Sequence, residues 1–498
     1  MEVIKLINNK VIFSALVVVA SQQAMAESTS KKIYDFMQDF HNNPREVMER
    51  LPIHSQPSSR FSDEDIKTGH FIEIKDQYRQ RIIGDMPGAV INTANDDPKK
   101  VVDNPNTFLS NIYEIDQQIP RKHRLPVQPW SDSYWPIYSG GLAFRYADRD
   151  LQQTSPQNWK EYFDFSTVTK PVSDYIGYVR KDLSPAEKYD LLVGDEKFNL
   201  TKKNWQAGQA YYDKNWPVQR WEGYCHGWAP AAYMMSRPAK TITVQDASGE
   251  DLTFYPADIK ALGTLLWASG SYAQNVIGGR CNIQNPKKDA NGRILDQNCF
   301  DNNPGSWHIA VLNQIGLNER SLVMDATYDF QVWNQPILSY DVTYFNPQTG
   351  RHYANLSQAI VSREQYTQDK FEDYRSPLAT QFVGVKMNLR YMAETNPRNR
   401  EYDSTRNDAS SLVSYHYDLE LNNDGKIIGG EWFSNMHPDF LWSVKKGAKV
   451  RSRYNGTGVW AEGQSVPASW HAAAVNASKY NQPISSVVEE LFRRSANN

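Results

Sequence analysis

Three residues that lie far apart in the sequence have the side chains needed for nucleophilic catalysis: Cys225, His308 and Asp325. A thiolate can attack a carboxamide carbon, and a histidine can take up and return the proton. A carboxylate can hold the imidazole in the tautomer that this transfer requires. Whether these side chains work together depends on the elements that carry them.

The sequence around Cys225 predicts the start of a helix. Residues 224–232 read YCHGWAPAA, and Pro230 is accepted in the first turn of a helix but not in its interior. We therefore expect a helix that begins within a residue or two of Cys225. Unpaired N–H groups at a helix start lower the pKa of a thiol and can bind an oxyanion. Gln219 and Trp221 are candidates for further oxyanion donors, with simple packing as the alternative for both.

The chain has only three cysteines, so at least one stays unpaired if a disulfide forms. Three pairings are open. Cys281 and Cys299 bracket a polar loop with little apolar material, which a disulfide would stabilise by roughly 3 kcal/mol. This pairing leaves Cys225 free, either as a reactive thiol or as an inert buried side chain.

The apolar run 307–312 predicts a strand that carries His308, and a turn over 316–320 leads to a second strand that ends at Asp325. In such a hairpin the carboxylate would hold one imidazole nitrogen while the other faces Cys225. Asp329 is the second choice for this carboxylate. The order helix-Cys, strand-His, next-strand-Asp is that of papain-type enzymes.

The predicted fold class is therefore α+β, with a papain-like or transglutaminase-like core in which a Cys-bearing helix packs on an antiparallel sheet that carries His and Asp. Residues 381–391 alternate as a half-buried strand, and 415–421 with 426–432 predict a β-hairpin. Helical spacing of apolar residues predicts a helical N-terminal region from Ile33 and a final helix over 483–494.

The turn of the predicted hairpin also spaces oxygen ligands like a calcium loop, through Glu420, Asn422, Asp424 and Glu431. A calcium loop begins with Asp rather than Glu and is flanked by helices, so the hairpin is the favoured interpretation. The predicted chemistry requires no cofactor, and calcium is the only one that a pattern in this sequence suggests. Paired ligands typical of a transition-metal site are absent from the sequence.

The first 26 residues have the three parts of a secretory signal peptide: basic Lys5 and Lys10, an apolar run over 11–20, and Ala24-Met25-Ala26 before Glu27. We expect a secreted or periplasmic protein that has no membrane span after cleavage. The remaining chain is predicted to divide into a helical, pro-region-like segment, 27–125, and a catalytic region, 126–498, with its core at 200–445. A formal net charge of -3 disfavours a nucleic-acid partner.

Two strings resemble the transglutaminase elicitor family of oomycetes, which has bacterial members: residues 224–232 around the cysteine, and 331–336 with the sequence QVWNQP. His308 and the string NQIG at 313–316 add to the resemblance, which is dense over roughly 220–340. It implies a secreted protein-glutamine γ-glutamyltransferase on a papain-like core, stimulated by calcium in some members. It also implies Cys225 as nucleophile, His308 as base and Asp325 as acid.

The resemblance favours acyl transfer, an aminoacyltransferase reaction in which a glutamine carboxamide of one protein passes through a Cys225 thioester to a lysine amine of another. The residues alone fit a cysteine peptidase or a cell-wall amidase equally well, because these enzymes differ in cleft shape and acyl acceptor. A catalytically silent surface interaction module is the third alternative, which the presence of Cys, His and Asp disfavours.

Overall fold

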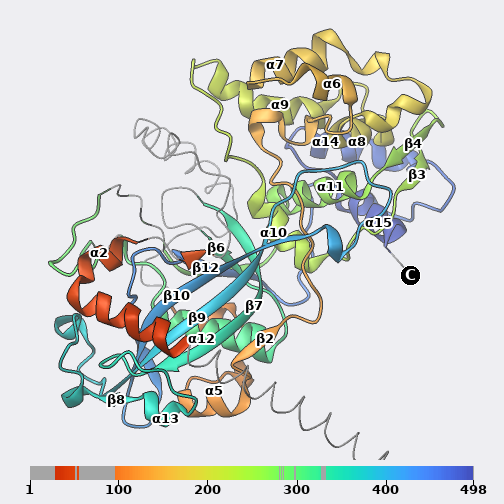
Figure 1. Cartoon of the computed structure of the whole chain (residues 1–498). Coiled ribbons are helices and arrows are strands. Elements are labelled where there is room, and N and C mark those ends of the chain that lie inside the picture. The colour runs from red at the N-terminus through yellow and green to blue at the C-terminus, as the bar shows by residue number, and fades with distance from the viewer. Residues whose placement is uncertain are drawn as a thin grey trace, which may run out of the picture.

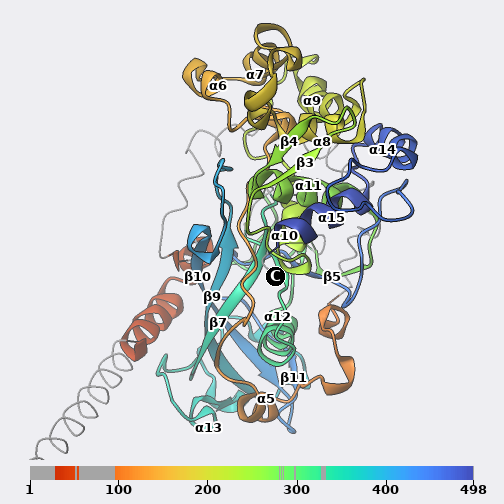
Figure 2. The same cartoon turned by 90° about the vertical axis from the view of Figure 1, so that its right-hand side faces the viewer.

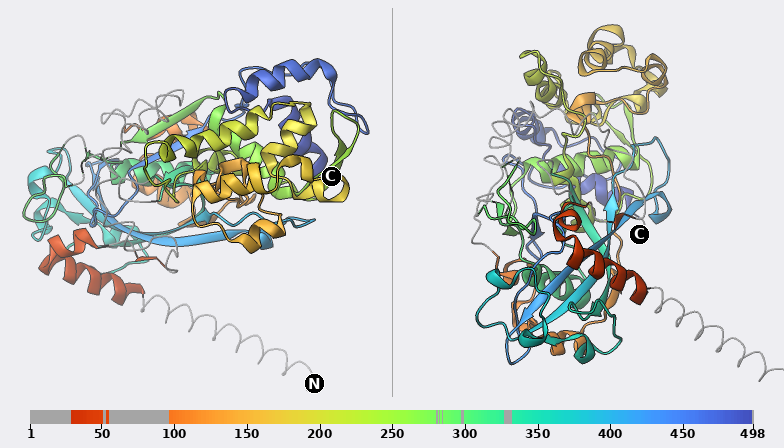
Figure 3. Two further views of the ribbon diagram at one scale, coloured as in Figure 1. Left: turned by 90° about the horizontal axis from the view of Figure 1, so that it is seen from above. Right: turned by 60° about the vertical axis from the view of Figure 1, so that its left-hand side comes forward.

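The computed structural model describes residues 29–50, 53–54, 96–279, 281, 283, 285–296, 299–326 and 332–496. The predicted signal peptide lies outside these residues. Figure 1 shows an elongated molecule in which a lobe built on a curled sheet lies below a mainly helical lobe. The view from above in Figure 3 shows the same elongation.

The sheet lobe is built on ten antiparallel strands, of which seven follow the order β1-β10-β9-β7-β6-β12-β5. Three long strands form its centre: β7 (Asn334–Phe345), β9 (Gln381–Ala393) and β10 (Ala409–Leu421). The shorter strands are β1 (Ile53–His54), β2 (Lys122–Arg124), β5 (Gln274–Gly278), β6 (Val323–Asp325), β8 (Val361–Ser362), β11 (Ile427–Gly429) and β12 (Phe440–Val444). The predicted strand at 381–391 and the predicted hairpin around 422–425 are confirmed.

Helices cover both faces of the sheet. Figure 2 shows α12 (Pro304–Val311) on one side of β9 and β10, and the N-terminal helices on the other. A helix over 29–42 and α2 (Pro44–Glu49) bury Met37 and Phe40 against Phe345 and Phe433. The short helices α5 (Ile112–Gln118) and α13 (Leu356–Ala359) complete this lobe. The predicted helical N-terminal pattern is thus confirmed over the described part, 29–49.

The helical lobe contains eight helices and a small hairpin among the described residues. They are α6 (Arg149–Thr154), α7 (Trp159–Asp164), α8 (Pro185–Val193), α9 (Asn199–Tyr212), α10 (Cys225–Met234), α11 (Pro256–Ser269), α14 (His471–Ser478) and α15 (Ser485–Ser495), with β3 (Ile242–Gln245) and β4 (Asp251–Phe254). Helix α10 packs against both α11 and β7, so it joins the two lobes. The final helix is confirmed as α15, which buries Val487, Val488 and Leu491.

The predicted strand at 307–312 is wrong, because residues 307–311 belong to α12 and Leu312 begins the π-helical turn that follows it. The side chain of Asn303 accepts the backbone N–H of Gly305 at 2.8 Å, and Pro304 occupies the first turn, which together start a helix. A short apolar run that is buried on all sides has no periodicity to separate strand from helix. The sheet therefore carries Asp325 on β6 but not His308, and no hairpin joins the two.

Two smaller findings concern the cysteines. Helix α10 begins at Cys225 as predicted, although Pro230 stands in its second turn rather than its first. Cys281 and Cys299 form a disulfide, and Cys225 is free, as predicted.

No helix within the described ranges is long and apolar enough to cross a membrane.

A buried ion pair ties the helical lobe to the polar segment 395–408 that connects β9 with β10. Arg237, which follows α10, donates to both carboxylate oxygens of Asp408, at 2.9 and 2.6 Å. Asp408 also accepts the backbone N–H of Ser131 and the amide of Gln128, and its side chain is only 2% exposed. Because four donors converge on one carboxylate, this pair fixes the segment against the helices.

We expect Asp408→Asn to lower the free energy of unfolding by about 2 kcal/mol, because it removes one of the two carboxylates that pair with the partly buried Arg237 and leaves Asp403 as its only charged partner. Thermal and denaturant unfolding measure the change. Asp424→Asn, in the exposed turn of the β10–β11 hairpin, is the matched control and should shift stability by less than about 0.5 kcal/mol. Equal stability of the two variants would contradict the role of Asp408.

Candidate active site around Cys225

The thiol of Cys225 lies where the start of α10 meets the start of β7. Its Sγ is 3.7 Å from the carbonyl oxygen of Val332 and 3.7 Å from Nδ2 of Asn334. The residue is 7% exposed. Both neighbours belong to the string that the sequence shares with the transglutaminase elicitor family.

Asn334 is held in the orientation that aims its amide at the thiol. The indole Nε1 of Trp442, on β12, donates to Oδ1 of Asn334 at 2.9 Å. An indole N–H can only donate, so the oxygen of the amide must face Trp442 and the NH₂ group must face the sulfur. The sequence pattern QVWNQP contains Asn334 but by itself predicted no role for this residue. The pattern was nevertheless the only sequence signal that could have pointed to it.

Asp325 ends β6 and pairs across the sheet with Asn334, which brings this carboxylate to the same site. It is fully buried, and its Oδ1 accepts the backbone N–H of Trp333 at 2.9 Å. Burial raises the pKa of the Cys225 thiol, and the charge of Asp325 raises it further. N–H groups of Asn334 and the backbone of His226 act in the opposite direction. The structure therefore brings two of the three predicted residues together.

His308 is not at this site. Its Nδ1 is 2.8 Å from the hydroxyl of Tyr417, and its Nε2 is 3.4 Å from the hydroxyl of Tyr344. Tyr344 lies ten residues along β7 from Asn334, about 30 Å of strand at roughly 3.3 Å per residue. Figures 1 and 2 both show α12 beside the lower half of the sheet and α10 above it. Burial lowers the pKa of His308 to about 3, so the ring is neutral.

Of the two predicted oxyanion donors, Gln219 differs from expectation, and the role of Trp221 stays a prediction. Nε2 of Gln219 donates to the carbonyl of Pro217 at 3.2 Å, so this amide turns back onto its own segment. Trp221 lines a cavity beside the site. The donors that act on the sulfur are the side-chain amide and backbone N–H of Asn334 and the backbone N–H of His226, the second residue of α10. The alternative carboxylate, Asp329, lies outside the described residues.

Two residues that sequence analysis missed extend the site beyond Asp325. Burial raises the pKa of Asp301 well above its usual range, and the charge of Asp325 adds to this. Nε2 of His437 lies 3.6 Å from Oδ2 of Asp301, and the ring stacks on Trp432 with centroids 4.6 Å apart. Burial lowers the pKa of His437 to about 4. Neither residue belongs to a local motif, so only the folded chain reveals them.

The calcium candidates do not form a ligand set. Glu420 faces Arg375 at 3.4 Å, and Glu431 makes two contacts with Arg293, at 2.9 and 3.0 Å. The side chain of Asn422 accepts two backbone N–H groups within its own turn, which also contains Asp424. These residues fit a β-hairpin rather than a calcium site. Across the described ranges no group of three or more His, Cys, Asp or Glu side chains is arranged to hold a metal.

The sequence matches the model of the transglutaminase elicitor family over residues 104–459, which is more than two thirds of the chain. The chain belongs to the transglutaminase elicitor family. No curated protein matches the chain. Among solved structures, the crystal structure of the GP42 transglutaminase from Phytophthora sojae is similar at 20% identity. The match covers 78% of this chain and 94% of that chain, with a TM-score of 0.49.

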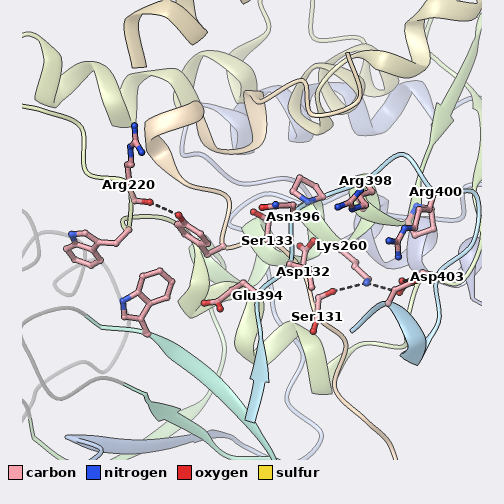
Figure 4. A pocket seen from close by; sticks show the side chains of 18 residues that line it. Ser131, Asp132, Ser133, Arg220, Lys260, Glu394, Asn396, Arg398, Arg400 and Asp403 are labelled. Atoms are coloured by element: carbon pink, nitrogen blue, oxygen red, sulfur yellow. Dashed lines mark hydrogen bonds and ion pairs between the residues drawn. The ribbon is translucent and has the colours of Figure 1, made fainter. Parts of the chain in front are cut away.

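A cavity of about 640 Å³ lies beside the thiol of this elicitor-family chain. Trp333, which lies between the two neighbours of Cys225, forms part of its wall together with Trp221 and Tyr134. Figure 4 shows Glu394 and Asp132 in its middle part. Trp333 therefore links the wall of the cavity to the surroundings of the thiol.

We expect Asn334→Ala to raise the pKa of Cys225 by about half a unit to one unit, because an amide that stabilises the thiolate is lost. Cys225 is the only free thiol, so its rate of iodoacetamide alkylation against pH reports this pKa. A change in access alters the plateau of the curve, whereas a change in pKa moves its midpoint. Asn422→Ala is the matched control, and an unmoved midpoint in Asn334→Ala would contradict the assigned contact.

His308 should make the protein acid-sensitive. In the folded state the ring stays neutral down to about pH 3, whereas the unfolded chain takes up a proton near pH 6.5. Its contribution to stability is therefore complete above about pH 6.5 and declines as the pH falls. When the pH is lowered from 6.5 to 5, we expect the free energy of unfolding to fall by roughly 2 kcal/mol less in His308→Gln than in the parent protein. Denaturant unfolding measures this change, and His471→Gln, at an exposed position, is the control. An unchanged pH dependence would mean that His308 ionises in the folded protein.

Proposed function

We propose that this protein is a secreted protein-glutamine γ-glutamyltransferase that uses Cys225 as its nucleophile. The observation that carries the proposal is the family match over 104–459, which includes Cys225 at the start of α10 beside Asn334 and Asp325. The proposed partners are two proteins, one that supplies a glutamine and one that supplies a lysine. The disulfide agrees with an oxidising compartment, and residues 1–26 have the composition of a secretory signal.

In the proposed first step, Sγ of Cys225 attacks Cδ of the glutamine side chain, the carbonyl carbon of its γ-carboxamide. The carbon–nitrogen bond then breaks, so that a thioester forms and ammonia leaves. The amide of Asn334 and the first N–H groups of α10 support the negative charge on the substrate oxygen. The carboxylate of Asp325 takes the thiol proton and returns it to the departing ammonia, which balances the step.

In the second step, a lysine amine attacks the thioester carbon, an isopeptide bond forms and the sulfur leaves. Asp325 accepts the proton of the amine and gives it back to the sulfur. Asp301 assists by its position, because burial and the charge of Asp325 both raise its pKa and so favour its protonated form beside Asp325. The surrounding tryptophans, Trp221 and Trp333, restrict the access of water to the thioester.

The sequence suggests His308 as the general base, whereas the proposed mechanism assigns this role to Asp325. In this structure both ring nitrogens of His308 contact tyrosine hydroxyls at the far end of β7. For His308 to reach the thiol, α12 would have to leave Tyr417 and Tyr344. The proposal therefore assigns proton transfer to Asp325 and treats His308 as the rival.

The test incubates the chain from Glu27 onwards with a glutamine-rich protein and a fluorescent primary amine. We expect amine incorporation that Cys225→Ala abolishes and Asp325→Asn lowers by about 100-fold, the usual scale for loss of a general base. His308→Asn should retain most of the rate. Incorporation with added calcium and with EDTA measures the calcium dependence suggested by the resemblance.

Each outcome separates the alternatives. Loss of incorporation in a folded His308→Asn variant, with Asp325→Asn active, would return the base role to His308. New N-termini on the protein substrate would indicate a peptidase, and ammonia release without incorporation an amidase. Incorporation that persists in Cys225→Ala would overturn the proposal altogether.

A further inference from the structure

The cavity beside Cys225 has more positive than negative side chains in its wall. Figure 4 shows Arg220 on one side, Arg398 and Arg400 on the other, and Glu394 with Asp132 between them. Lys260 and Asp403 also contribute to the wall. Its volume of about 640 Å³ lies within the range of ligand sites, so a short peptide segment fits it.

The interior charged groups of the cavity are held by ion pairs or hydrogen bonds to their neighbours. Nζ of Lys260 lies 2.7 Å from Asp403, which also pairs with Arg237 at 2.9 Å. Asp132 is fully buried and accepts the indole N–H of Trp135 at 2.8 Å, and burial raises its pKa to about 7. Glu394 accepts the amide of Gln335 at 2.6 Å. Asp403 is thus neutralised by its cations and burial disfavours the charged form of Asp132, so Glu394 is the main interior negative charge against the three arginines of the rim.

The three arginines at the rim are exposed, and none of them pairs with an acidic side chain among the described residues. Arg220 donates to the hydroxyl of Tyr138 at 3.2 Å, and its guanidinium lies 4.9 Å from the centre of that ring. Arg398 and Arg400 form no ion pair within the part of the chain that the structure describes. Guanidinium groups bind carboxylates with two parallel hydrogen bonds, so three of them around one cavity favour an acidic ligand.

We propose that this cavity binds acidic residues that flank the reactive glutamine of the donor protein. Trp333 lines the cavity, and its two chain neighbours contact Sγ of Cys225, so a peptide bound to the thiol reaches the rim within a few residues. The carboxylates of the peptide pair with Arg398 and Arg400 on one side and Arg220 on the other. The inference rests on the proposed function for the identity of the glutamine, but the acidic site itself is tested without it.

The binding test uses the full chain from Glu27 with Cys225→Ala, so that no reaction occurs. A fluorescent glutamine peptide flanked by Asp and Glu is compared by anisotropy with the same peptide carrying Ser at those positions. We expect the acidic peptide to bind about tenfold more tightly at low salt, and Arg398→Gln with Arg400→Gln to remove this difference. Arg149→Gln, an exposed arginine on α6, is the matched control and should leave binding unchanged.

The same two peptides then serve as donors for the chain with Cys225 intact. Acid-dependent binding without amine incorporation would leave the site standing and remove the transferase proposal. Incorporation with equal rates for both peptides, insensitive to Arg398 and Arg400, would overturn the acidic site and leave the transferase. Equally tight binding of an oligonucleotide of the same charge would also overturn the acidic peptide site, because the arginines would then bind any polyanion and not specifically an acidic peptide.

Discussion

The contact between the start of α10 and the start of β7 is the constraint on which the candidate site depends. Cys225 and Asn334 are the first residues of these elements, and the amide of Asn334 is fixed by Trp442 from a third element. Asp325 reaches the thiol only because it pairs with Asn334 across the sheet. A shift of β7 by one residue would turn Asn334 to the other face, since strand side chains alternate.

The string from Val332 to Pro336 has a physical role at each position. The carbonyl of Val332 and the amide of Asn334 approach the sulfur, and the N–H of Trp333 is bound by Asp325. Gln335 donates to Glu394 at the end of β9, which links the thiol to the cavity wall. The four contacts of Val332, Trp333, Asn334 and Gln335 constrain each of these positions in the folded chain.

Sequence reasoning placed Cys225, the disulfide and the long strands because each has a local signal. Pro230 marked the helix, the polar loop marked the disulfide, and strict alternation marked β9. It failed at His308 because an apolar run that is buried all round predicts strand and helix equally well. It also missed Asp301 and His437, whose proximity to Asp325 arises from pairings between distant segments.

Burial sets the chemistry that these groups can perform. His308 is neutral, and both of its ring nitrogens contact tyrosine hydroxyls. In this conformation the ring is therefore part of the packed interior of the sheet lobe. At the thiol the same burial disfavours the thiolate, which only nearby N–H groups offset. A bound substrate excludes water from the site and adds a carbonyl oxygen on which negative charge develops during the attack. Hydrogen bonds from these N–H groups to the sulfur and to that oxygen are stronger when water is absent. Under the proposed acyl transfer, these contacts favour the thiolate more when a substrate fills the site than in the empty protein.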